Sequence, residues 1–426
     1  MNAQAGLAFE QAPPLALPLR FFLTAPLFLF AAGLLVALAP AALAARWMPQ
    51  ALALTHAVTL GFLAMTMLGA LAQMLPVVAG SPMPAPRLVA WASHAPLTLG
   101  SIALVAGFLG GGRLAFGLAA ALLGAGFAVF LAAAAASLVR AAAGATVNGI
   151  RLATAALAIA VPLGIALALP RAGGWASPDV DATLAAHVAF GLVGWVLLLV
   201  IGVAYQVVPM FQITPPYPPR LVRWLAPGLF GLLLLYAAAP WLPAVVGRAA
   251  EAGIGVGVLL FACATLRLQM RRRRRLPDVT LDYWRIGMAS LVVCVAGWAA
   301  GRVWPVWGGH DAFALLLGIV FLGGFALSVV TGMLYKIVPF LAWFHLQAQL
   351  QARAGSIPTM KEMMAEAGMR WQFRLHLVAC ALFLVAVLQP WLTVAAGGVL
   401  SLSALLLWLN LLSAVRRFSR HGGGFG

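Results

Sequence analysis

One apolar stretch occurs three times without a gap in the sequence. The copies run from Gly61 to Pro76, Gly194 to Pro209 and Gly324 to Pro339. Each starts Gly-aromatic, has a second Gly eight residues on, and carries a Gln or Lys three residues before the closing Pro. The closing prolines are 133 and 130 residues apart, which is the length of four membrane helices with their loops. A repeat of this length predicts three copies of a four-helix unit.

The two glycines of each stretch predict close helix packing. At about 100° per residue, positions eight apart lie about 80° from each other on a helix surface. Glycine lets two backbones approach closely in lipid, where the hydrophobic effect does not drive helices together. The second helix of each unit is therefore expected to be an inner, tightly packed helix, and the closing Pro, which cannot donate to the backbone ladder, is expected to end it.

Composition indicates a membrane protein. Hydrophobic residues make up 64% of the 426 residues, charged residues only 8%, and mean hydropathy is +1.03. We therefore expect an all-α polytopic membrane protein, one membrane domain over 1–426, with repeats at about 20–140, 150–268 and 285–415. The apolar runs predict twelve transmembrane helices. They are 20–44, 51–75, 88–110, 114–138, 150–169, 183–208, 221–243, 249–266, 285–304, 311–338, 371–388 and 390–414.

The basic residues predict the orientation. With the N-terminus in the cytoplasm, 21 of the 26 Lys and Arg residues fall on the cytoplasmic side of those spans. The positive-inside rule then places both termini in the cytoplasm of a bacterial inner membrane. The net charge of +17 thus reflects topology and contact with anionic lipid, especially at Arg271 to Arg275, and nucleic acid is not expected as a partner. The residues at 345–369 are expected to form an amphipathic interfacial helix.

Histidines are the candidate carriers of chemistry, because the nine Asp and Glu residues all lie outside the spans or at their ends. His56 stands 20 residues before Pro76 and His187 stands 22 before Pro209, so their depths differ by about 3 Å. Neutral imidazole is a good axial ligand for heme iron, and an apolar helical bundle suits heme. We therefore take His56 and His187 as candidate ligands of heme b (protoheme). The alternative interpretation, that each is a structural histidine at a helix–helix interface near a helix end, stays open.

Other histidines are weaker metal candidates. His310 lies on the same outer side but about 13 Å beyond the depth of His56, which favours a surface or supporting role. His94 and His376 begin equivalent helices on the cytoplasmic side and define a second, weaker site. The three cysteines form no CxxC or CxxCH motif, so covalently attached heme and a thiolate zinc site are not expected.

The segment from His56 through GALAQMLPVVAGSPMPAPRL resembles the second helix of subunit I in the heme-copper oxidase and nitric oxide reductase superfamily. There a His opens the helix, Gly pairs follow, and a Pro-rich segment ending in Pro-Arg closes it. The resemblance implies twelve helices in three pseudo-symmetric groups of four, heme ligands toward the outer surface, and His56 in the position of the low-spin heme ligand. A respiratory complex or cytochrome is then the candidate partner.

The chain departs from that superfamily at the oxygen-reducing centre. The seventh span lacks the paired His that hold copper, and the tenth has Leu317 and Ile319 where two heme-ligating His would stand. Copper is therefore a candidate cofactor without a standard motif. Any oxidoreductase activity would not use the oxygen-reducing centre of that superfamily. The chain is more similar in kind to NnrS-type heme membrane proteins, which implies electron transfer or nitric oxide or oxygen handling.

Two other function classes stay open. A transporter or metal permease without heme would use soft ligands such as Met65, Met67 and Met74 together with the histidines, although Met at such spacing is usually core packing. Proton coupling is disfavoured by the lack of a carboxylate within the spans. A non-catalytic subunit or assembly factor of a respiratory complex would copurify with partners and carry no cofactor.

Overall fold

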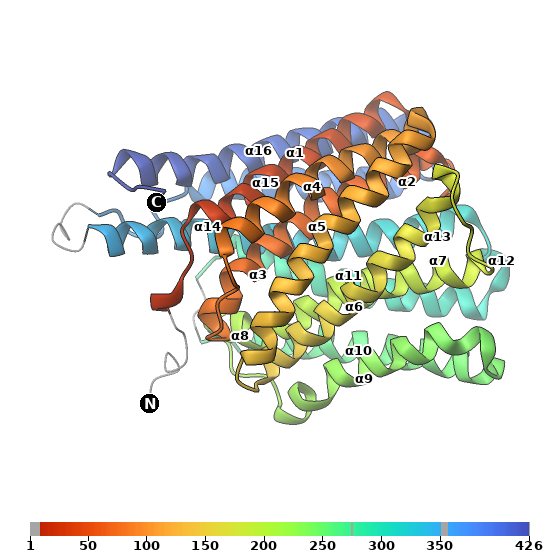
Figure 1. The fold of residues 1–426 in the computed structure, drawn as a ribbon, viewed down its shortest axis with the longest axis horizontal. Helices are drawn as coiled ribbons and strands as arrows, with labels where there is room; N and C mark the ends of the chain where they lie inside the picture. The colour runs from red at the N-terminus through yellow and green to blue at the C-terminus, as the bar shows by residue number, and fades with distance from the viewer. Residues whose placement is uncertain (1–8, 274–275, 351–356, 426) are drawn as a thin grey trace. The chain divides into compact units, whose positions relative to one another are not determined.

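The computed structural model describes residues 9–273, 276–350 and 357–425, and every regular element within them is helical (Figure 1). Within these residues, eleven continuous helical segments are long and apolar enough to cross a membrane. The chain is thus an all-α, multi-pass membrane protein in its composition and architecture. The eleven segments are Ala16–Leu38, Pro49–Val78, Pro86–Arg140, Ala145–Ala172, Val180–Gln212, Pro219–Trp241, Ala244–Met270, Val279–Val303, Asp311–Gln349, Glu366–Ala386 and Pro390–Arg420.

The principal helices within these segments carry the labels of Figure 1. In chain order they are α1 (Ala16–Leu38), α2 (Pro49–His56), α3 (Met65–Val78), α4 (Pro86–Ala106), α5 (Gly112–Arg140), α6 (Ala145–Ala168), α7 (Val180–Val188), α8 (Leu198–Gln212), α9 (Pro219–Ala238), α10 (Ala244–Met270), α11 (Val279–Val303), α12 (Pro305–Gly308), α13 (Asp311–Ile319), α14 (Ser328–Gln349), α15 (Glu366–Ala386) and α16 (Thr393–Arg420).

The apolar runs expected from the sequence coincide with these helices to within six residues, except that the run 311–338 stops eleven residues before α14 ends at Gln349. Two of them, 88–110 and 114–138, fall in the one 55-residue segment Pro86–Arg140. That segment bends sharply between α4 and α5, where Gly110 and Gly112 have φ of +110° and +66°. Glycine adopts such angles without steric cost. Beyond the bend, α5 packs against α4 (Figure 1).

A π-helical segment overlaps the start of each of the three repeated stretches. The segments are η3 (Ala57–Ala64), η6 (Ala189–Leu197) and η8 (Val320–Leu327). All three end twelve residues before the closing Pro of their stretch. π-Helices are rare and are frequent at functional sites. The three stretches therefore share a backbone feature as well as a sequence pattern.

The repeated glycines pack as the sequence predicts. A Cβ built on Gly61 or Gly69 would lie within 2.7 Å of Phe28 or Phe21 of α1. In the second stretch, the equivalent glycines lie against Ala156 and Gly149 of α6, and in the third against Ser290 and Tyr283 of α11. In each case the partner is the helix that precedes the repeated stretch. The expectation of closely packed helices is confirmed.

The expectation that the closing prolines end these helices is wrong. Pro76, Pro209 and Pro339 lie inside α3, α8 and α14, and α14 continues ten residues further, to Gln349. Proline removes only its own backbone N–H from the ladder, and neighbouring helices and side chains can satisfy the carbonyl that loses its partner.

The expected interfacial helix at 345–369 is also corrected. Helix α14 extends to Gln349, residues 357–365 are irregular with a turn at 360–363, and α15 begins at Glu366. Residues 351–356 lie outside the described residues. Pro358 lacks the N–H for a helix here, and the Glu362 carboxylate accepts a 2.7 Å hydrogen bond from the Thr359 N–H. This bond lowers the pKa of the exposed Glu362.

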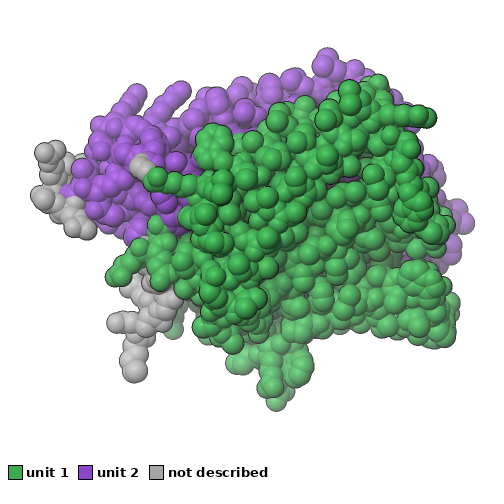
Figure 2. Space-filling view, in the orientation of Figure 1, with its two compact units in different colours: residues 1–12, 74–276 green, residues 13–73, 277–426 purple. Residues whose placement is uncertain are grey.

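The helices group into two compact units (Figure 2). The first comprises residues 1–12 and 74–276, in which α4 packs on α5, α6 on α8, and α9 on α10. The second comprises residues 13–73 and 277–426, in which α16 packs on both α1 and α15, and α11 packs on α14. The division falls inside the first expected repeat and between the second and third.

Candidate functional site

His187 lies near the end of α7, two residues before η6. Its Nδ1–H donates a 2.9 Å hydrogen bond to the backbone carbonyl of Ala160 in α6. A carbonyl can only accept, so the proton is on Nδ1 and the lone pair is on Nε2. Among the described residues, Nε2 has no hydrogen-bond partner. Metal-ligating histidines are usually oriented by a hydrogen bond from the ring N–H that does not face the metal, often to a backbone carbonyl.

A glycine in α6 makes space for the His187 ring. A Cβ built on Gly164 would lie 2.7 Å from Cε1 of His187. The ring therefore lies directly against the helix backbone, one turn from the carbonyl that holds it. Any side chain at position 164 would displace the imidazole.

We expect Gly164→Ala to reduce heme retention through His187. The added methyl would move the imidazole, and misorienting a metal ligand typically costs about 10–100-fold in affinity. Heme per purified chain measures the effect. Gly191→Ala, in η6, is the matched control, because no atom lies within 4 Å of the Cβ it adds. Equal heme loss in both variants would contradict the role of Gly164.

His56 is the last residue of α2, immediately before η3. Its Nδ1 lies 2.8 Å from the carbonyl of Leu52, one turn back in the same helix. This bond also places the proton on Nδ1 and the lone pair on Nε2. His56 and His187 thus share a tautomer and a position beside a π-helix. They belong to different units, so their convergence on one iron stays a prediction.

The weaker histidine candidates have different surroundings. His310 is exposed and caps α13, where its Nδ1 accepts a 3.1 Å hydrogen bond from the Ala312 N–H. With that lone pair occupied, the proton is on Nε2, and this arrangement does not offer a nitrogen to a metal. His94, in α4, belongs to the first unit, and His376, in α15, to the second. Their pairing therefore also stays a prediction. The described residues contain no group of three or more His, Cys, Asp or Glu suited to a metal ion.

Sequence reasoning missed a buried polar network in the second unit. Gln372 of α15 is at its centre: its Oε1 accepts hydrogen bonds from the hydroxyls of Tyr283 and Tyr335. Its Nε2 donates a 3.0 Å bond to Ser403 of α16, and Asn410 donates a 3.0 Å bond to Tyr335. The network joins α11, α14, α15 and α16, and polar side chains between apolar helices hold such bundles together.

Replacing Gln372 with Leu should destabilise the second unit. It would leave two tyrosine hydroxyls and Ser403 without their partner, which we expect to cost about 1–3 kcal/mol of unfolding free energy. Unfolding of the purified protein in mixed micelles by denaturing detergent measures this. Gln389→Leu, at the exposed end beyond α15, should change stability little. Equal stability of the two variants would show that the network contributes nothing.

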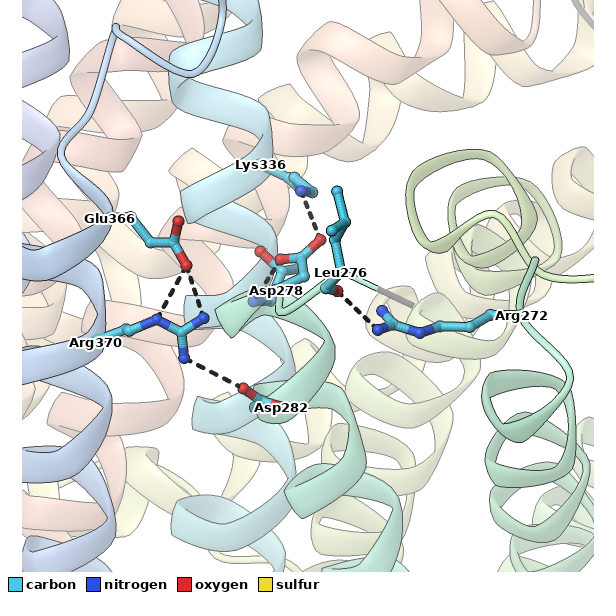
Figure 3. Close-up of polar contacts among 8 residues, drawn as sticks. Arg272, Leu276, Asp278, Asp282, Lys336, Glu366 and Arg370 are labelled. Atoms are coloured by element: carbon cyan, nitrogen blue, oxygen red, sulfur yellow. Dashed lines mark hydrogen bonds and ion pairs between the residues drawn. The ribbon is translucent and has the colours of Figure 1, made fainter. Parts of the chain in front are cut away.

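Ion pairs also join α11 to α14 and α15 (Figure 3). Asp278 caps α11 and forms a 2.8 Å ion pair with Lys336 of α14. Arg370 of α15 lies 2.7 Å from Glu366 and 3.9 Å from Asp282 (Figure 3). Lys336 is the basic residue of the third repeated stretch, where the first two have Gln. The three acids lie at the starts of α11 and α15, as the sequence indicated, whereas Lys336 lies within α14.

The chain was compared with known protein families and with curated proteins, and neither a family model nor a curated protein matches it.

Proposed function

We propose that this chain is an integral membrane protein that binds heme b through His187 and His56 and serves in electron transfer or in nitric oxide or oxygen handling. The proposal depends on one observation, the tautomer and position of the two imidazoles. Each donates Nδ1–H to a backbone carbonyl, which leaves the lone pair on Nε2, beside a π-helix in a repeated stretch. Neutral, carbonyl-oriented imidazole is the form that ligates heme iron.

The repeat architecture supports the proposal. We infer twelve spans in three four-helix units, because Pro86–Arg140 is too long for one crossing: 55 residues of helix would extend about 80 Å. Its glycine bend and the packing of α5 on α4 suit two antiparallel spans. The shared π-helices and the shared glycine contacts with α1, α6 and α11 favour a common origin for the three units.

The distribution of basic residues gives the proposed orientation, with both termini in the cytoplasm of a bacterial inner membrane. His56 and His187 then lie toward the outer leaflet. A respiratory or cytochrome protein meeting the outer face is the proposed redox partner.

His56 and His187 have the donor that heme iron needs, a neutral imidazole nitrogen. A bound heme would supply one-electron redox chemistry. The chain's own part is to hold two neutral nitrogen ligands: the Ala160 carbonyl orients His187, the Leu52 carbonyl orients His56, and Gly164 gives the His187 ring its space.

Heme analysis of the purified chain tests the proposal. Protein expressed with ample heme should contain protoheme that acid–acetone extracts, since no CxxCH motif is present to hold it covalently. Heme-free protein from such an expression would overturn the proposal. If that heme-free protein also took up a labelled solute or copper ion in vesicles, the transporter alternative would replace the heme proposal. If the heme-free protein copurified with a respiratory complex, the subunit or assembly-factor alternative would replace it.

A further inference from the structure

Two equivalent motifs of arginine and tryptophan lie in the first unit. Helices α4 and α9 each start with the sequence Pro-Arg-Leu-Val-x-Trp, and its Arg stands eleven residues after the closing proline of the preceding repeated stretch. An Arg and a Trp four residues apart share one face of a helix. Arg87 and Arg220 are exposed, as are Trp91 (62%) and Trp224 (64%). We call Arg87 with Trp91, and Arg220 with Trp224, the two Arg–Trp motifs.

A further arginine lies beside the first motif. The hydroxyls of Ser81 and Ser137 each donate a hydrogen bond to the other's backbone carbonyl, which ties the loop before α4 to the end of α5. Arg140, the last residue of α5, donates a 3.1 Å hydrogen bond to the carbonyl of Pro82 in that loop. Arg140 and Arg87 therefore flank one loop at the same end of the helix pair.

The second motif has the same construction. The hydroxyls of Tyr217 and Thr265 lie 2.8 Å apart, which ties the loop before α9 to the last turns of α10. Arg220 follows Tyr217 by three residues and Arg267 follows Thr265 by two, so both arginines lie at this end of the pair. Arg223, three residues after Arg220 in α9, adds a third exposed guanidinium.

These arginines have no carboxylate to offset their charge. Among the residues that the structure describes, none of the five forms an ion pair with an Asp or Glu; they are Arg87, Arg140, Arg220, Arg223 and Arg267. Like charges that share a helix face repel each other, so an anion bound between them is stabilising. A planar guanidinium can bind a phosphate through two parallel hydrogen bonds, which makes phosphate the anion that these groups suit best.

The surface beyond each motif is apolar. On α4 the exposed side chains further along the helix include Leu99 (56%) and Ile102 (52%), and on α9 they include Leu234 (47%). From Arg87 to Ile102, or from Arg220 to Leu234, a helix rises roughly 20 Å, which is about the thickness of one leaflet with its headgroups. Tryptophan also settles at the headgroup level of a bilayer. A basic end followed by a long apolar face matches a phospholipid, whereas a free phosphate or an acidic peptide would use only the basic end.

We propose that the two Arg–Trp motifs, each with its neighbouring arginines, bind the headgroups of anionic phospholipids such as phosphatidylglycerol. The guanidinium groups hold the phosphodiester, the indole lies at the headgroup level, and the acyl chains follow the apolar face of α4 or α9. A zwitterionic lipid brings a cationic amine close to the arginines, so it binds more weakly. The α9 site has three arginines and the α4 site two, so the α9 site is the tighter one.

The motifs are distinct from the basic run Arg271 to Arg275, where composition placed the contact with anionic lipid. Arg272 of that run donates a 2.7 Å hydrogen bond to the carbonyl of Leu276, so its guanidinium is partly used within the loop. Residues 274 and 275 lie outside the described residues. The proposal uses no residue of the heme proposal and depends only on the chain's location in a membrane.

Native mass spectrometry of the purified full-length protein in nonionic detergent, titrated with phosphatidylglycerol or phosphatidylcholine, tests the proposal. We expect two tightly held phosphatidylglycerol molecules per chain, bound in preference to phosphatidylcholine and less tightly at high salt. Arg220→Gln should weaken one of the two about fivefold and leave the other unchanged, since a basic residue near anionic lipid contributes about this factor. The double variant Arg87→Gln/Arg220→Gln should weaken both.

Arg248→Gln is the matched control. It removes the same charge from an exposed position at the other end of α10, so it should bind both lipids as the unmodified protein does. Arg220→Lys keeps the charge and should recover most of the binding that Arg220→Gln loses. Because all these arginines are exposed, the variants should fold, and size-exclusion chromatography checks that they do.

Three results would overturn the proposal. The first is equal binding of phosphatidylcholine and phosphatidylglycerol. The second is an equal loss of phosphatidylglycerol in Arg248→Gln and Arg220→Gln, which would show that only the net charge matters. The third is displacement of phosphatidylglycerol by an equal concentration of inorganic phosphate, which would show that the motifs bind a free anion and make no use of the acyl chains.

Discussion

His187→Ala should lose most of the bound heme and its low-spin absorption bands. The imidazole is the proposed axial ligand, and no other described side chain takes its bond to Ala160. We expect heme per chain to fall about tenfold or more. Disturbing only the orientation of a metal ligand already lowers metal affinity about 10–100-fold, and removing the ligand should cost at least as much. Heme extraction and the visible spectrum of the purified variant measure the change.

Added imidazole should partly restore those bands, because the substitution leaves a space of the shape of the lost ring. A variant that is merely unfolded would not respond. His310→Ala, which removes an exposed helix cap, is the control and should keep its heme. An unchanged spectrum in His187→Ala would remove His187 from the proposed ligand set.

Gly202→Ala should destabilise the first unit more than any other single-methyl change considered. Gly202 of α8 and Gly149 of α6 meet backbone to backbone: a Cβ on Gly202 would lie 2.9 Å from Cα of Gly149. No flexible side chain can move aside there, so the helices must separate. Overpacking of this kind costs about 1–3 kcal/mol of unfolding free energy, sometimes more. Denaturing-detergent titration of the purified protein gives the value.

Gly228→Ala provides the comparison within the same unit. Gly228 lies in α9, and no atom lies within 4 Å of the Cβ it would gain. Alanine has the higher helix propensity, by up to about 1 kcal/mol, so this variant should be neutral or slightly more stable. If Gly202→Ala were as stable as Gly228→Ala, the close contact between α6 and α8 would not matter to folding.

Much of the fold could be predicted from sequence because lipid allows few solutions. Apolar length alone located the helices, and the repeated glycines identified the surfaces that pack closely. The sequence misled at Pro76, Pro209 and Pro339, since a single missing N–H does not end a helix that its neighbours support. It also could not reveal the π-helices, which change the hydrogen-bond ladder without a fixed residue signature.

The candidate site was less predictable. Repeat position pointed to His56 and His187 but could not reveal the Ala160 carbonyl or Gly164, which come from a helix about 25 residues away in the chain. The network around Gln372 escaped notice because its members come from four separate helices, and no motif or spacing links them in the sequence. Asn410, deep in an otherwise apolar run of α16, was the available signal.

The reduced-minus-oxidised absorption spectrum of the purified, heme-supplied protein tests the central claim most directly. Bound b-type heme with two imidazole ligands predicts a sharp Soret shift and well-resolved α and β bands on reduction, diminished in His56→Ala as well as in His187→Ala. A featureless spectrum, or bands of full intensity in both variants, would contradict it.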